Sequence, residues 1–370
     1  MKFTVTKQAF LDGLQRIQNV VSTRVTLPIL SNVLVETTPT GLRLMATDTE
    51  LSISTHVPAT IEKQGGTTLP ARRLASIIRE LPAEEIFMET DSRNLTSIRS
   101  GPSFFKVYGL SKEEYPAFPS FEEMRGFSMK QNELKDGLDK TSYAVSQDEA
   151  RYVLNGLLFS FKESSLTLVA TDGRRLALCD VELGEIKYPT GHECDFIVPT
   201  KAINELERLL TTDQDIRLYI GENRAVFDLG TSVLATKLVD GTYPNYRQVI
   251  PTEINERIVL EREPLLQAAR RAALLSIDRN SSICLKFTEN NLDITSNAPE
   301  IGETKESLPI SYKGRSLCMS FNPDFFLDPL KNLNEDTVVL ELIDEMSPGV
   351  FKINSARRFV YVLMPIKVSI

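Results

Sequence analysis

The segment GLRLMATD at residues 41–48 decides the fold, because the chain repeats it. An apolar run at residues 29–37 precedes it, and the same order returns as an apolar run at 153–160 followed by SLTLVATD at 165–172. Asp48 and Asp172 are 124 residues apart, and the same interval leads from Asp172 to Ser296, which ends a more diverged copy, NLDITS. This regular spacing indicates three tandem copies of one structural unit.

Each copy is predicted to be an α+β domain with two antiparallel sheets and two helices. Alternating apolar residues at 42–45 and 226–229 favour strands, and Asp172-Gly173 and Asp240-Gly241 favour hairpin turns. Phe10, Leu14, Ile17 and Val21 repeat at helical spacing. We therefore expect domains over residues 1–123, 124–252 and 253–370. The six expected helices cover residues 6–22, 71–81, 130–146, 200–210, 262–276 and 323–333.

The net charge of −8 argues, for the chain as a whole, against nucleic-acid binding. The expected helices, however, hold 14 basic and 10 acidic residues, which leaves +4 on the helices and −12 elsewhere. An acidic chain with this distribution is able to present one basic face to phosphates. Ordinary solvated helices of mixed charge remain the alternative interpretation.

Enzyme, metal and membrane signals are missing from the sequence. It has no phosphate-binding loop, dinucleotide fingerprint, zinc-protease motif or nucleophile elbow, and we expect no cofactor and no metal. His56 is expected in a strand and His192 in a loop. The four cysteines are widely separated, so we expect reduced thiols packed as small apolar groups, or an incidental exposed thiol. The polar N-terminus and the lack of a long apolar run predict a cytoplasmic protein with no membrane partner.

The size of the repeat is compatible with a ring around DNA. A domain of about 123 residues has a diameter of about 35 Å, and six such domains in a ring leave a hole of about that diameter. A duplex about 20 Å wide passes through it. Three domains make half of a six-domain ring, which a head-to-tail dimer closes.

Six stretches carry a likeness to a known family: residues 1–5, 26–32, 151–156, 169–177, 237–246 and 361–366. With the triplication, they make the whole chain resemble the bacterial DNA polymerase III beta subunit family, the replicative sliding clamps. The resemblance implies a ring-shaped homodimer without catalytic activity that encircles duplex DNA irrespective of sequence. It also implies partners that dock through short linear peptides: the polymerase III alpha subunit, the clamp loader, other polymerases and repair proteins. A clamp-like scaffold that does not encircle DNA, and a hydrolase using scattered carboxylates, are the alternatives.

The same resemblance assigns roles to individual residues. For DNA contact it implies Arg24, Lys201, Arg72 and Arg73. For the dimer interface it implies Arg72, Arg73, Ile77, Leu274, Leu275, Glu300 and Glu303, and Glu306 joins the glutamates expected to pair with the arginines. For a partner-peptide pocket it implies Leu154, Thr171, Gly173, Arg174, Arg175, Leu176, Pro244, Val249, Val362, Leu363, Met364, Pro365 and Ile366.

The chain departs from the family pattern at several positions. Gln248 replaces an arginine that clamps often place beside the pocket, and Val153 replaces an aromatic residue. The loop around Gln147 is expected to be one residue longer, so no DNA role is assigned to Gln147. Ser369 and Ile370 extend the tail, so the peptide preference of the pocket is left open.

Overall fold

The structure, a computed structural model, describes residues 1–21, 27–121, 124–162, 165–183, 194–275, 282–298 and 301–367. These residues form two units. The first unit comprises residues 1–132 and 204–238, and the second comprises residues 133–183, 194–203 and 239–367. Arg24, His192, Glu300, Ser369 and Ile370 lie outside the described residues.

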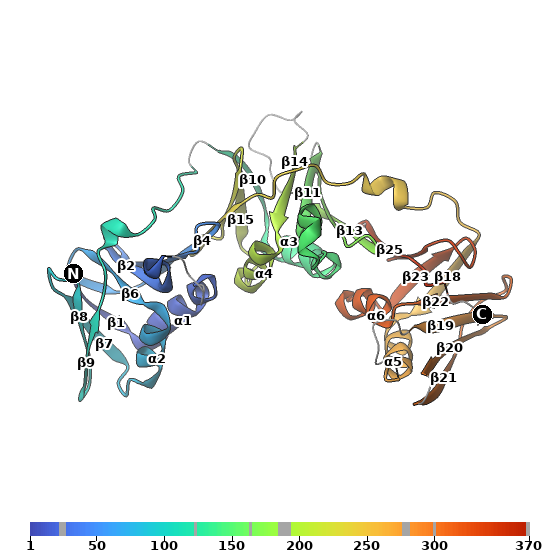
Figure 1. Cartoon of the computed structure of the whole chain (residues 1–370), viewed down its shortest axis with the longest axis horizontal. Coiled ribbons are helices and arrows are strands. Elements are labelled where there is room, and N and C mark those ends of the chain that lie inside the picture. Colours follow the sequence, from blue (N-terminus) through green and yellow to red (C-terminus); the bar gives the residue numbers. More distant parts are fainter. Residues whose placement is uncertain are drawn as a thin grey trace. The chain divides into compact units, whose positions relative to one another are not determined.

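The first unit contains two antiparallel sheets (Figure 1). The strand orders are β5-β1-β7-β8-β9 and β10-β15-β16-β17-β4-β3-β2-β6. Its strands are β1 (Lys2–Thr6), β2 (Asn32–Thr38), β3 (Gly41–Thr47), β4 (Leu51–Val57), β5 (Thr60–Lys63), β6 (Gly66–Pro70), β7 (Glu85–Thr90), β8 (Leu95–Ser100), β9 (Ser103–Tyr108), β10 (Arg125–Lys130), β15 (Asp215–Ile220), β16 (Arg224–Asp228) and β17 (Ser232–Lys237). Helices α1 (Lys7–Ile17) and α2 (Ala71–Glu80) pack on each other, and α1 also contacts strands of both sheets, β1, β3 and β4.

The second unit also contains two antiparallel sheets. The strand orders are β14-β11-β12-β13-β25-β24-β23-β18 and β21-β20-β19-β22. Its strands are β11 (Gly156–Lys162), β12 (Ser165–Thr171), β13 (Arg175–Glu182), β14 (Cys194–Pro199), β18 (Glu256–Glu261), β19 (Ile283–Thr288), β20 (Asn291–Ala298), β21 (Gly302–Pro309), β22 (Leu317–Phe321), β23 (Thr337–Leu342), β24 (Gly349–Lys352) and β25 (Phe359–Leu363). Helices α5 (Arg262–Ala273) and α6 (Pro323–Asn332) pack on each other beside the sheets (Figure 1). The remaining helices of the described residues are α3 (Gln131–Asp139) and α4 (Thr200–Leu209), with short 3₁₀ turns at η1 (Gln18–Val20), η2 (Pro28–Ser31), η3 (Lys112–Glu114), η4 (Ser142–Ala144), η5 (Glu149–Leu154) and η6 (Tyr246–Val249).

Helix-to-sheet packing repeats at the interval of 124 residues. A Cβ added to Gly13 of α1 would lie 2.4 Å from a Val57 methyl group and 3.0 Å from Leu44. A Cβ added to Gly137 of α3 would lie 2.5 Å from Val181 and 3.0 Å from Leu168. All three residues of the first set have their counterparts 124 positions later. In both copies a helix approaches its sheet so closely that only glycine fits, which accounts for the shared glycine.

The aspartates of the two repeated segments also make equivalent turns. The Asp48 carboxylate accepts hydrogen bonds from the backbone N–H groups of residues 50 and 51, and Asp172 does the same for residues 174 and 175. Asp172-Gly173 therefore lies in the predicted hairpin, between β12 and β13. The hairpin predicted at Asp240-Gly241 is wrong: this dipeptide lies in an irregular segment after β17. Gly241 does adopt a positive φ of 117°, so the dipeptide marks a turn, but the chain continues to η6 instead of pairing back as a strand.

The expected helices are all present, but two of them end early. The helical stripe of Phe10, Leu14 and Ile17 is buried as predicted, yet α1 stops at Ile17 and continues only as a 3₁₀ turn. The helix expected over 130–146 ends at Asp139. There the Thr141 hydroxyl donates to the Gly137 carbonyl at 2.7 Å, so the side chain competes with the backbone for its helical partner.

Candidate functional site

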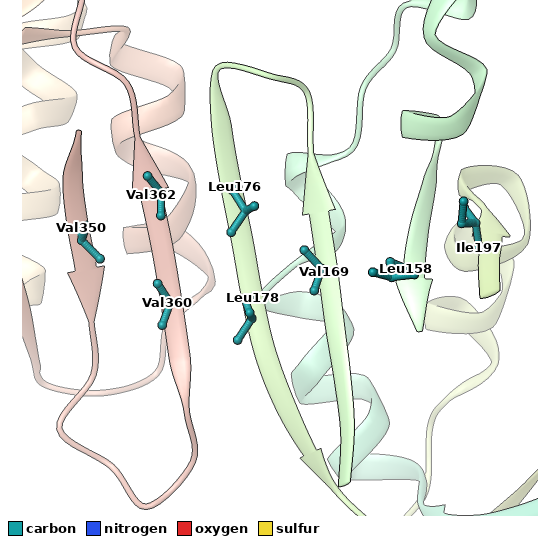
Figure 2. Packing of buried hydrophobic residues seen from close by; sticks show 8 residues of the cluster. All are labelled: Leu158, Val169, Leu176, Leu178, Ile197, Val350, Val360 and Val362. Carbon is teal, nitrogen blue, oxygen red and sulfur yellow. The ribbon is translucent and has the colours of Figure 1, made fainter. Parts of the chain in front are cut away.

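An apolar cluster forms on one face of the eight-stranded sheet of the second unit. Figure 2 shows its members on neighbouring strands of the sheet. The buried members are Leu158, Val169, Leu176, Leu178, Ile197, Val350, Val360 and Val362. Side chains of the segment 239–250, among them Tyr243, Tyr246 and Ile250, pack against this cluster and are only partly buried. The segment 239–250 and Val153 of η5 thus cover the apolar cluster with partly buried side chains.

The structure places part of the predicted pocket at this cluster, including Pro244 and Val249 in the segment 239–250. Leu176 and Val362 belong to it and are opposite each other in the pairing of β13 with β25. The Met364 N–H donates to the Arg174 carbonyl at 3.0 Å, which places the exposed Met364 side chain beside the hairpin. Exposed or half-buried members are Leu154, Thr171, Gly173, Arg174, Pro244, Val249, Met364, Pro365 and Ile366. Leu363 is buried, like Leu176 and Val362.

Arg175 differs from the other predicted pocket residues because its guanidinium is buried and fully engaged. It donates to Asp172 at 3.1 Å, to Asp328 at 2.5 Å and to the Tyr143 carbonyl, and it lies over the Phe325 ring at 4.2 Å. Asp328 is on α6, whereas Arg175 begins β13. Arg175 therefore ties the hairpin after β12 to helix α6 of the third repeat.

A polar cavity of about 850 Å³ lies next to this guanidinium, within the second unit. Arg151, Asp172, Arg174, Asn322 and Phe325 are among its lining residues. Arg151 closes one side by donating to the Asp172 carbonyl at 3.2 Å. Arg151, Asn322 and Phe325 were not predicted as site residues. The Asn322-Pro323 helix start is visible in the sequence, but no pattern links it to the hairpin 150 residues earlier.

A second ionic group connects α3 to the third repeat. The Lys140 side chain is only 4% exposed and pairs with Asp136 at 3.0 Å and Glu335 at 3.1 Å. Burial would lower the pKa of Lys140, but its hydrogen bonds to these carboxylates raise it overall. Arg357 pairs with Asp136 and Glu133 of α3. The Arg175 group and this second ionic group therefore each join the second and third repeats.

Fewer basic residues of the helices are exposed and unpaired than the count from the sequence suggests. Lys140 is buried, and Arg208 and Arg271 have carboxylate partners within the chain. Arg72 and Arg73 are exposed at the start of α2, and Lys201 is exposed at the start of α4. Among the described residues, no carboxylate is within ion-pair distance of Arg72 or Arg73, so both remain available for phosphates or for a partner subunit.

The predicted dimer residues lie on the first unit's α2 and around the end of α5 and the start of β21. Leu274 is 75% exposed directly after α5, and Glu303 is exposed on β21. Ile77 and Leu275 are half-buried. Glu306 is already engaged, since Arg271 donates to it at 2.6 and 2.9 Å. Glu306 is thus already paired within the chain, and its pairing with the arginines of a partner stays a prediction.

Sequence reasoning missed an exposed aromatic edge. Strand β9 is at one end of the five-stranded sheet and carries Phe104, Phe105 and Tyr108, of which Tyr108 is 81% exposed. Arg99 and Lys106 lie over the Phe104 ring at 5.4 and 5.8 Å. The sequence does indicate an exposed aromatic surface, because SFFKVY places aromatic residues at adjacent positions and hence on both faces of one strand.

Comparison with protein families identifies all three repeats. Residues 1–119 match the N-terminal domain of the DNA polymerase III beta subunit, residues 128–245 its central domain and residues 247–367 its C-terminal domain. The beta sliding clamp of Escherichia coli is 34% identical over 99% of this chain and 100% of that protein. The beta sliding clamp of Chlamydia muridarum is 33% identical over 99% of both chains.

Solved structures give the same result. The DNA polymerase sliding clamp of Bacillus subtilis superposes with a TM-score of 0.95 at 30% identity, and each chain is fully covered. A Pseudomonas aeruginosa sliding clamp, solved bound to griselimycin, superposes with a TM-score of 0.93 at 33% identity over the full length of both chains.

Three tandem antiparallel α+β domains of this kind define a sliding clamp, a processivity factor without catalytic activity. The chain belongs to the DNA polymerase III beta subunit family, the bacterial beta sliding clamps. The alternative of a hydrolase is therefore discarded. Within the described residues, no helix has the length and apolarity needed to cross a membrane.

Proposed function

We propose that this beta clamp works as a ring-shaped head-to-tail homodimer that encircles duplex DNA. The proposal is based on two edge strands with no neighbour on one side. One edge carries aromatic and basic side chains, and the other carries an acidic side chain. Strand β9 ends one sheet and exposes aromatic side chains beside Arg99 and Lys106. Strand β21 ends another sheet and exposes Glu303, next to the exposed Ile301.

An unpaired strand edge is a template for pairing with another chain. Antiparallel addition of β9 from one subunit to β21 of the next would satisfy both rows of backbone groups and bury the aromatic residues against Leu274 and Ile301. Because the two edges are different surfaces, each subunit would use both of them in head-to-tail contacts. Two subunits related by a twofold rotation would then close a ring. Arg72 and Arg73 of α2 would then face the acidic residues around β21.

Within that ring, DNA contact is proposed for exposed basic residues that start helices: Lys201, Arg72 and Arg73, with Arg24 outside the described residues. Phosphate contacts by lysine and arginine are independent of sequence and allow sliding. A few such contacts suffice, because encirclement rather than affinity keeps the clamp on DNA.

Partner proteins are proposed to bind at the apolar cluster of the second unit. The exposed Met364 and Val249 provide apolar anchors, and the exposed Arg174, whose carbonyl accepts from the Met364 N–H, offers a hydrogen-bond donor. This combination suits a short linear peptide with apolar side chains. The polymerase III alpha subunit, the clamp loader, other polymerases and repair proteins are the proposed ligands, and the cytoplasm is the proposed location.

The dimer is tested with Leu274→Asp. Leu274 is 75% exposed in the single chain, so the substitution should leave the fold intact but place a charge in the proposed interface. Size-exclusion chromatography with light scattering is expected to give a dimer mass for the wild type and a monomer mass for the variant. Val259→Asp, at a site 57% exposed on β18, is the matched control and should remain dimeric. A monomeric wild-type protein at micromolar concentration would contradict the ring.

A further inference from the structure

Two cysteines lie side by side on neighbouring strands of the four-stranded sheet. Cys284 is on β19 and Cys318 on β22, which pair antiparallel with Cys284 opposite Ser320 and Cys318 opposite Lys286. The two thiols are therefore diagonal neighbours on one face of the sheet. Their Sγ atoms are 2.8 Å apart, and neither belongs to a disulfide.

This face of the sheet is open to small molecules. Along β19 the alternate residues Ile283, Leu285 and Phe287 are fully buried, so Cys284 points to the opposite side. Cys318 is exposed and Cys284 is half-buried. The expectation that the cysteines pack as small apolar groups holds for the buried Cys179 but not for Cys318.

We propose that Cys284 and Cys318 form an oxidisable dithiol, which a low-molecular-weight disulfide converts into a reversible intramolecular disulfide. The Cys318 thiolate attacks one sulfur of the small disulfide and releases one small thiol. The Cys284 thiolate then attacks the Cys318 sulfur of the mixed disulfide and releases the second small thiol. The two cysteines lose two electrons and two protons, and the small disulfide gains both as two thiols.

The crosslink would fasten an edge strand that supports the partner site. Strand β22 ends its sheet, and its Ser320 carbonyl accepts a hydrogen bond from the Ile366 N–H at 2.7 Å. Ile366 follows Met364, which we place at the rim of the apolar cluster. On the other side, the Cys318 N–H donates to Glu345 at 2.9 Å. A bond between β19 and β22 would therefore steady the backbone that holds the segment 364–367. Formation of the disulfide does not depend on the proposed partner site.

The test uses the full-length wild-type protein with oxidised glutathione. Partial burial, followed by the neighbouring Cys284 thiol and Glu345, raises the pKa of Cys318 to about 11. The incubation is therefore run at about pH 8.5, where more thiolate is present than at neutral pH. The free thiol count is expected to fall from four to two, with a Cys284–Cys318 link in the peptide map, and dithiothreitol should restore all four.

Two variants separate the dithiol from a reactive single thiol. Cys194→Ser should still lose two thiols on oxidation, whereas Cys284→Ser should retain glutathione as a mixed disulfide on Cys318. Four free thiols after oxidation of the wild type, a lasting mixed disulfide on it, or disulfide-linked dimers would each overturn the proposal. Hydrogen exchange tests the consequence: the Ile366 amide should exchange more slowly in the oxidised protein, and equal exchange in both forms would refute the link to the segment 364–367.

Discussion

Arg175 is a buried cation with two carboxylates, one carbonyl and an aromatic ring around it. Its side chain is 8% exposed, so removing the charge would leave the partly buried carboxylates of Asp172 and Asp328 without their shared partner. Breaking a buried ion pair on one side costs about 3 kcal/mol or more.

We expect Arg175→Met to lower the free energy of unfolding by that amount in urea denaturation. The exposed neighbour gives the control, since Arg174→Met should change it by less than about 0.5 kcal/mol. A similar small effect of both substitutions would show that Arg175 does not join the repeats.

Met364 is the residue on which the proposed partner site can be tested most simply. It is 45% exposed, so Met364→Ala removes an accessible apolar anchor without opening a core cavity. An anchor residue contributes more than about 1 kcal/mol, which corresponds to a loss of affinity of about fivefold or more. Fluorescence polarisation with a labelled linear peptide from the polymerase measures this. The comparison variant is Val259→Ala, which should bind normally; an unchanged affinity for Met364→Ala would place the peptide elsewhere.

At the scale of elements, the Asp293 carboxylate of β20 adds side-chain contacts to the backbone ladder that holds edge strand β21. Asp293 accepts hydrogen bonds from Ser307 at 2.6 Å and Asn291 at 2.9 Å and pairs with Lys305 at 2.9 Å. These contacts, Ser307 first, lower the pKa of Asp293 to about 2. Because the folded pKa is below the unfolded value, the stabilisation is complete above about pH 4 and is lost as the pH falls through about 2.

Asp293→Asn is therefore expected to be less stable than the wild type at pH 5, with the difference shrinking towards pH 2. Urea unfolding across this range gives the two free energies. Asp213→Asn changes an exposed carboxylate for which the described residues provide no partner, so it should match the wild type throughout. A difference for Asp293→Asn that stays constant with pH would mean that the carboxylate charge does not hold β21.

Many of the helices and strands, and the repeat itself, could be predicted from the sequence. The interval between Asp48 and Asp172 predicted the repeat, and helical spacing predicted α1, because each rests on local periodicity. The engagement of Glu306 by Arg271 and the pairing of Arg175 with Asp328 could not be predicted, because they join residues far apart in the chain whose distance depends on packing. The exposed aromatic residues of β9 could have been predicted, because two adjacent aromatic residues break the alternation of apolar and polar residues in a half-buried strand.

At the scale of the whole molecule, the proposed ring makes the net charge of −8 compatible with DNA binding, because encirclement would not depend on affinity. In that proposal Arg72, Arg73 and Lys201 would provide a few phosphate contacts, and the closed ring would provide persistence. Replacing Arg72 and Arg73 together with glutamine should weaken both the dimer and DNA contact, since both roles are proposed for them. In the same variant, the mass measured by light scattering and the fraction of protein retained on DNA are expected to fall together.

This clamp is proposed to be held on DNA by topology. The direct measurement is retention of the labelled protein on a nicked circular plasmid after treatment with clamp loader and ATP, before and after the plasmid is cut once. We predict that the clamp stays on the circle through gel filtration and is lost from the linear form within the same period. Equal retention on circular and linear DNA would contradict encirclement.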